Sequence, residues 1–178
     1  MATSPILITS FQPWRAHQAS NSSDDLILAL HADGQLPHNS IWIRNVPVSF
    51  ELAPIRVISA LCQYRPRAII CCGMAENRPH LSIEQQAKHA EKTLHTSIDL
   101  QRLLKHTKLS EISYDAGSYV CNALYYSVLE SIQAHNLPTA AIFAHIPILQ
   151  GACKRLVQND FLSITQQLAS ITQMGALR

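Results

Sequence analysis

Long apolar runs are absent from this chain of 178 residues. Although 47% of the residues are hydrophobic and only 15% are charged, no stretch approaches the roughly 20 apolar residues that span a bilayer. Residues 1–8 contain no basic region and lead straight into an apolar run, so we expect no signal peptide and a cytoplasmic location. The sequence therefore gives no indication of a membrane partner.

A strong excess of charge is also missing. The 14 basic and 12 acidic residues leave a formal net charge of +2, and they form no basic patch of the kind that nucleic-acid binding requires. The five cysteines, at positions 62, 71, 72, 121 and 153, include no Cys-x-x-Cys pair, which favours reduced thiols over a disulfide framework. No repeat, low-complexity tract or linker divides the chain. We therefore expect one domain over residues 1–178, and nothing indicates a cofactor.

Short apolar runs alternate with amphipathic segments along the chain. Strands separated by helices predict a single α/β domain, with a twisted, mostly parallel sheet and helices on both faces (α/β/α). Arg44 and Pro47 interrupt the second strand, which favours a place at the edge of the sheet or the end of the strand. Residues 82–95 are polar and helix-prone, with poor periodicity. We expect strands at residues 5–9, 40–48, 67–72, 111–113 and 139–144, and helices at residues 24–32, 51–64, 99–106, 120–135 and 157–171.

Cys121 stands at the start of the predicted helix 120–135. A thiol in the first turn of a helix lies at the positive end of the helix dipole, which favours the thiolate. His145 ends the strand predicted after this helix, and open α/β sheets carry their sites at such strand ends. A nearby imidazole could accept the thiol proton, so the pair indicates a cysteine hydrolase. Taken alone, a buried core cysteine and a histidine that bonds a carbonyl explain the same two residues.

Five segments, in order along the chain, extend this interpretation. They are ILITSFQPW (6–14), VPVSF (46–50), GMAENR (73–78), DAGSYVCN (115–122) and AHIP (144–147). Together they resemble the pyroglutamyl peptidase I family of cytosolic cysteine peptidases, also called pyrrolidone carboxyl peptidases. The segment around Cys121 is similar to the family's nucleophile motif, Thr-Ala-Gly-Thr-Phe-Val-Cys-Asn, and this is the most specific of the matches.

The resemblance implies a catalytic triad and a substrate class. Cys121 would attack the carbonyl carbon of an N-terminal pyroglutamyl residue, or a related lactam or acyl group, on a peptide with a blocked N-terminus. His145 would hold and then deliver the proton, and Glu84 would orient His145. The backbone N–H of Cys121 would support the oxyanion. Phe11 and Trp14 correspond to the aromatic residues that sandwich the lactam ring, and family members commonly form homo-oligomers.

Several positions depart from the family pattern. Met74 stands where the family has a glutamine that binds the lactam amide, and a thioether is only a weak acceptor. Glu76 and Asn77 replace a glycine pair, at which the family backbone is expected to adopt unusual φ angles. The family arginine that supports the oxyanion has no counterpart near residues 94–95. The segment 89–100 is shorter than in the family, so the substrate pocket is predicted to be altered.

Two alternatives stay open on the sequence alone. The first is a divergent relative that binds a small ligand or a partner without turnover, or that has an altered specificity. The second is a metal-dependent hydrolase, because His80 and Glu84 lie four residues apart and His89 follows. A helix could present two of these side chains as ligands on one face, although the His-x-x-x-Glu spacing is a weak signal.

Overall fold

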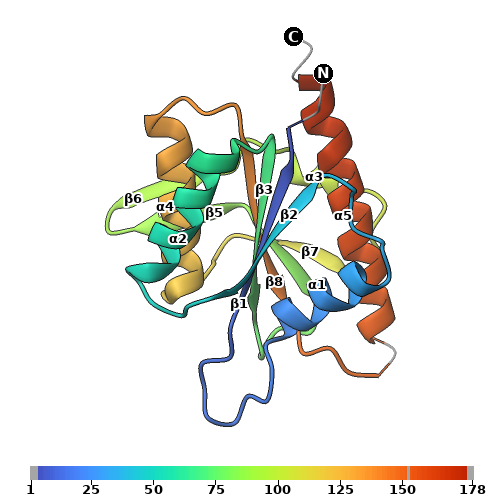
Figure 1. The fold of residues 1–178 in the computed structure, drawn as a ribbon. Coiled ribbons are helices and arrows are strands. Elements are labelled where there is room, and N and C mark those ends of the chain that lie inside the picture. Colours follow the sequence, from blue (N-terminus) through green and yellow to red (C-terminus); the bar gives the residue numbers. More distant parts are fainter. Residues whose placement is uncertain (1–3, 152, 176–178) are drawn as a thin grey trace.

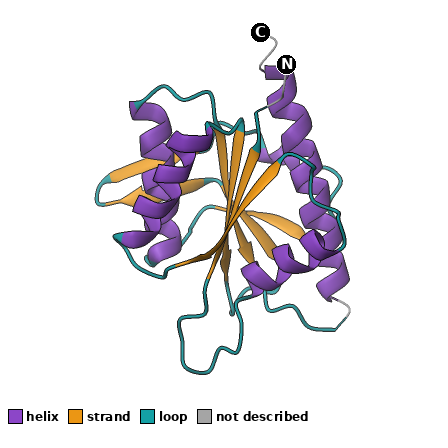
Figure 2. Ribbon diagram, in the orientation of Figure 1, coloured by secondary structure: helices purple, strands orange, loops and turns teal. Residues whose placement is uncertain are grey.

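A six-stranded sheet runs through the middle of the molecule (Figures 1 and 2). The structure is a computed structural model that describes residues 4–151 and 153–175. The first four strands of the sheet run parallel, whereas the fifth and sixth run in the opposite direction. The prediction of a mostly parallel sheet is therefore confirmed. From one edge to the other, the strands are β2 (Ser40–Val46), β1 (Ile6–Phe11), β3 (Ala68–Met74), β8 (Ala140–Ile146), β4 (Leu81–Glu84) and β7 (Ser110–Ser113).

Helices cover both faces of this sheet, as Figure 1 shows. On one face lie α2 (Leu52–Tyr64) and α4 (Val120–Ala134), and on the other lie α1 (Ser22–Ala32) and α5 (Cys153–Gly175). The short helix α3 (Leu100–Leu103) contacts α5. The strand sequences explain this arrangement, because successive side chains of a strand point to opposite faces. Ile6 and Ile8 of β1 pack into the core under α1 and α5, whereas Leu7 packs into the core under α2 and α4.

Local signals account for the helix boundaries. Asn21 caps α1, since its side chain accepts a hydrogen bond from the backbone N–H of Ser23. The start predicted at residue 24 was therefore two residues late. Helix α4 buries Leu124 and Val128 completely, as its helical spacing predicted. Strand β2 lies at the sheet edge, which agrees with the prediction from its interrupting Arg44.

Residues 82–95 form strands, so their predicted helical tendency is not realised. Strand β4 buries Leu81 and Ile83 between β8 and β7. A tight turn at Ala90, with φ of +49°, then joins β5 (Gln86–His89) to β6 (Lys92–His95) in an antiparallel hairpin. Tertiary pairing with β8 and β7 overrides local propensity here.

No helix within residues 4–151 and 153–175 has the length and apolar character that crossing a membrane requires.

Candidate active site

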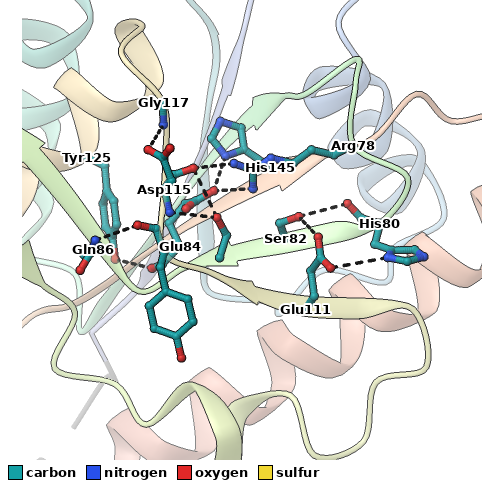
Figure 3. A network of polar contacts seen from close by, with 12 residues as sticks. Arg78, His80, Ser82, Glu84, Gln86, Glu111, Asp115, Gly117, Tyr125 and His145 are labelled. Atoms are coloured by element: carbon teal, nitrogen blue, oxygen red, sulfur yellow. Dashed lines mark hydrogen bonds and ion pairs between the residues drawn. The ribbon is translucent and has the colours of Figure 1, made fainter.

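His145 and Glu84 form a buried pair on two neighbouring strands. Strand β8 carries His145 and strand β4 carries Glu84, and these strands pair antiparallel. His145 Nδ1 lies 2.6 Å from Glu84 Oε1, and the two side chains are 7% and 0% exposed (Figure 3). An ionised carboxylate only accepts hydrogen bonds, so Nδ1 of His145 donates in this contact, and Nε2 is the ring nitrogen that Glu84 does not bind. The histidine ring also packs on Phe143, with 4.8 Å between ring centroids.

Cys121 lies in the first turn of α4, with its sulfur against Gly73. A Cβ atom added at Gly73 would lie only 2.7 Å from Cys121 Sγ, so the absent side chain makes room for the sulfur. Gly73 is the register partner of His145, and neighbouring strands lie about 4.8 Å apart. The thiol and the imidazole therefore occupy adjacent positions on the α4 face of the sheet.

The surroundings of Cys121, which is partly exposed, favour the neutral thiol. Desolvation, with the negative charge of Glu84, raises the pKa of the Cys121 thiol to about 12, and the positive charge of Arg78 only partly opposes this. The start of the helix is therefore insufficient to ionise the thiol, contrary to the expectation of a resting thiolate. The sulfur needs a base to become a nucleophile, and the free nitrogen of His145 is the base that the sheet places beside it.

Glu84 is held in its charged form. Burial alone would raise its pKa, but the hydrogen bond and charge of His145, with smaller contributions from Ser113 and Arg78, leave the pKa of Glu84 below its usual range. Arg78 Nη1 lies 2.7 Å from the same oxygen, Oε1, that His145 contacts (Figure 3). The hydroxyl of Tyr125 donates to the backbone carbonyl of Glu84 at 3.1 Å. These contacts fix both the charge and the position of the carboxylate.

Two residues of this site, Gly73 and Arg78, received no role from the sequence. They are the first and last residues of the segment 73–78, one of the motifs that resemble the family. This motif was the available signal, but it did not indicate which side chain each residue meets. Besides its contact with Glu84, Arg78 donates from Nη2 to the backbone carbonyl of Asp115 at 2.7 Å.

The three predicted pocket residues, Phe11, Trp14 and Met74, lie in three different surroundings. Phe11 is buried in the core under α2 and α4. Trp14 lies half exposed in the loop after β1 and packs against Tyr119, with 6.2 Å between ring centroids. Met74 Sδ accepts the backbone N–H of Ser22 at 3.4 Å. Because side chains alternate along β3, Met74 points to the α1 face, away from Gly73 and the Cys121 sulfur.

Glu76 anchors the loop that carries Trp14. Its carboxylate lies 3.1 Å from Arg15 Nη1, 3.1 Å from His17 Nε2 and 2.9 Å from Gln18 Nε2. Hydrogen bonds from Gln18 and His17 lead the contributions that lower the pKa of Glu76. Neither Glu76 nor Asn77 has a positive φ. The unusual backbone expected at the replaced glycine pair is therefore not adopted, and the glutamate side chain has a tethering contact instead.

The shortened segment also contains no arginine close to the triad. Residues 94–95 lie in β6, where Leu94 packs on the core under α4 and His95 is exposed. The guanidinium that contacts the triad comes instead from Arg78.

The metal alternative rested on a helix that is not formed. Glu84 lies on a strand and is bound by His145 and Arg78, whereas His80 is 3.7 Å from Glu111. Across residues 4–151 and 153–175, no three His, Cys, Asp or Glu side chains are grouped as a metal site would require.

Comparisons with known proteins agree with the fold. The sequence model of the family described as "Pyroglutamyl peptidase" matches residues 93–173, which include Cys121 and His145 but not Glu84. The pyrrolidone-carboxylate peptidase of Bacillus mycoides (strain KBAB4) is 25% identical over 171 residues, covering 81% of this chain and 78% of that protein. That of Bacillus cytotoxicus is 22% identical over 192 residues, covering 93% and 88%.

Solved structures of such peptidases share the whole fold. The pyrrolidone carboxyl peptidase from Thermococcus litoralis superimposes with a TM-score of 0.82 at 18% identity, covering 97% of this chain and 96% of that one. The pyroglutamyl peptidase I of Bacillus amyloliquefaciens gives a TM-score of 0.80 at 20% identity, covering 94% and 97%. The chain is therefore similar in part of its sequence to pyroglutamyl peptidases, and it shares their fold.

Proposed function

We propose that the protein is a cysteine peptidase that removes an N-terminal pyroglutamyl residue, or a related lactam or acyl group, from peptides. Cys121 is the nucleophile, His145 the general base and acid, and Glu84 the residue that orients His145. One observation carries the proposal: the buried 2.6 Å contact between His145 and Glu84 lies beside the Cys121 sulfur, which fits into the space left by Gly73. The names of the relatives supply the substrate class.

The first half of the reaction forms a thioester. Because the Cys121 thiol has a pKa near 12, it enters the reaction protonated, and His145 Nε2 takes its proton as the sulfur attacks the acyl carbon. Glu84 stabilises the resulting imidazolium. The carbonyl oxygen of the substrate gains negative charge and accepts a hydrogen bond from the backbone N–H of Cys121. Backbone N–H groups in the first turn of a helix have no acceptor inside the helix, and no side chain caps α4 at Tyr119.

The second half releases the acid. The tetrahedral adduct collapses, the bond from the acyl carbon to the peptide nitrogen breaks, and the imidazolium of His145 gives its proton to the leaving amine. A water molecule then attacks the thioester while His145 accepts one of its protons. Collapse of the second adduct breaks the bond to sulfur and releases the carboxylic acid, and Cys121 regains its proton.

Recognition of the lactam ring is assigned to Phe11 and Trp14. A flat, uncharged ring suits aromatic faces, and Glu76 holds the loop that presents Trp14. Met74 is the weakest of the proposed contacts, because its sulfur already accepts the N–H of Ser22. The preference for pyroglutamate over other acyl groups therefore depends mainly on Trp14 and its loop.

The proposal is tested by release of a fluorophore from an N-terminal pyroglutamyl amide under reducing conditions. We expect turnover by the wild type and a loss of at least a thousandfold in Cys121→Ser, since removal of a triad member leaves only residual catalysis. Cys62→Ser is the matched control, because Cys62 is an exposed free cysteine on α2, and it should retain full activity. Equal turnover by the wild type and Cys121→Ser would refute the mechanism.

A further inference from the structure

Arg78 joins two parts of the site that the sequence separates. It lies in the loop between β3 and β4, and its side chain is 25% exposed. One arm of the guanidinium, Nη1, meets Glu84 Oε1 at 2.7 Å. The other arm, Nη2, donates to the backbone carbonyl of Asp115 at 2.7 Å. Figure 3 shows both contacts beside the pair of His145 and Glu84.

The contact between Arg78 and Glu84 affects the charge of the triad. A carboxylate that is 0% exposed loses its hydration and needs compensating groups to remain ionised. His145 and Arg78 meet the same oxygen of Glu84. The guanidinium thus balances the charge of Glu84 permanently, whereas the imidazole can do so only while it carries a second proton.

The second contact bears on the position of the nucleophile. Asp115 begins a turn in which its Oδ1 accepts the N–H of Gly117 at 3.0 Å, and Gly117 adopts a φ of +77°. The loop then leads through Tyr119 into the first turn of α4, where Cys121 lies. Arg78 therefore ties the loop before the nucleophile to the carboxylate behind the base.

We propose that Arg78 is a positioning residue of the triad, which keeps Glu84 ionised and docks the loop 114–119 so that Cys121 lies beside His145. This inference rests on the proposed function. It requires an arginine, because only the planar fork of a guanidinium reaches two acceptors in fixed directions, whereas a lysine presents one point charge.

The test is the rate of Cys121 alkylation by iodoacetamide, measured at pH 7 by peptide mass spectrometry, together with backbone hydrogen exchange of residues 114–119. Alkylation needs no substrate and follows the thiolate fraction. Loss of the guanidinium charge in Arg78→Met should slow alkylation about tenfold, the effect of one charge at close range.

The ionisable and polar groups that surround this site are Arg78, Glu84, Ser113, Asp115, Cys121, Tyr125 and His145.

Three variants separate the two effects. Arg78→Met should slow alkylation and also speed exchange in the loop. Arg78→Lys should recover most of the alkylation rate but leave exchange fast, because it keeps the charge and loses the fork. Arg56→Met is the matched control, since Arg56 also donates to a backbone carbonyl, that of Asn45, and it should change neither measurement.

A reference variant, His145→Ala, distinguishes failure of this inference from failure of the proposed function. If His145→Ala slows alkylation while Arg78→Met changes neither rate nor exchange, Arg78 has no positioning role and the triad stands. If alkylation is the same in the wild type and in His145→Ala, the triad is refuted, and the role of Arg78 with it. Circular dichroism of each variant establishes that it is folded.

Discussion

The space left by Gly73 is what lets the Cys121 sulfur lie against the sheet. A Cβ at this position would lie 2.7 Å from Cys121 Sγ, which is closer than real contacts allow, and 3.0 Å from Phe143 Cζ, which is tighter than most real contacts. We expect Gly73→Ala to destabilise the protein by about 1–3 kcal/mol, the usual cost of overpacking. A displacement of the sulfur by about 1 Å should also lower kcat/KM about a hundredfold.

A double-mutant cycle checks the cause. Urea unfolding of Gly73→Ala, alone and combined with Cys121→Ala, should give a smaller cost in the combined variant, because the nearer of the two clashing groups is gone. Equal costs in both backgrounds would mean that the sulfur does not occupy this space.

The residue scale also shows what the sequence could and could not predict. Cys121 and His145 were predicted from a helix start and a strand end, and Glu84 from the motif resemblance. The structure places all three at one site. The sequence indicated a helix start, which favours a thiolate at Cys121. It could not indicate the desolvation that raises the pKa of this thiol to about 12. The role of Arg78 was missed because it depends on a loop carbonyl 37 residues away.

Among the elements, those with a strong apolar period were predicted and those that depend on distant partners were not. Helix α4 and strand β8 lie within two residues of their predicted bounds. The segment from β4 to β6 is polar along much of its length, and its strands form only because other parts of the chain meet it. Asn122 shows this directly, since its side chain accepts from the N–H of Lys88 at 2.9 Å and donates to the carbonyl of Lys88 at 2.7 Å.

This contact also links the hairpin to the site. The hairpin of β5 and β6 lies beside α4 (Figure 1), and Asn122 follows the nucleophile directly in the first turn. The hairpin therefore holds the first turn of α4 through Asn122, and the loop bound by Arg78 leads into the same turn.

At the scale of the whole molecule, the sheet order brings together residues that are far apart in the chain. Glu84 and His145 are separated by 61 positions. They meet because β4 lies between β8 and β7, antiparallel to β8 and parallel to β7. The sequence predicted strands and helices but not this reversed strand, which parallel pairing through helical crossovers does not anticipate. The order of the strands in the sheet is therefore as necessary for the site as the sequence motifs are.

The charge of Glu84 should make the folding stability depend on pH. Its pKa is lowered in the folded protein, so its charge stabilises the fold above its ordinary pKa of about 4.3, and this contribution is lost as the pH falls through the folded value. At pH 7, Glu84→Gln should be less stable by on the order of 3 kcal/mol, the cost of breaking a buried pair. The difference in free energy of unfolding between the wild type and Glu84→Gln should become smaller as the pH falls below about 4.

Urea unfolding between pH 3 and 7 measures this gap. Glu91→Gln is the control, since Glu91 is exposed in the turn between β5 and β6, and its stability should follow the wild type throughout. A gap between the wild type and Glu84→Gln that is independent of pH would show that the carboxylate charge does not stabilise the fold.

The central claim is that Cys121 attacks a pyroglutamyl carbonyl with the help of His145. Its most direct test is labelling by pyroglutamyl chloromethyl ketone, in which an alkylating carbon replaces the leaving amide, followed by peptide mass spectrometry. We predict that the reagent labels Cys121 before the other four cysteines, faster than the matched prolyl ketone, and that His145→Ala removes this advantage. First labelling of another cysteine, or equal rates for the two ketones at Cys121, would contradict the account.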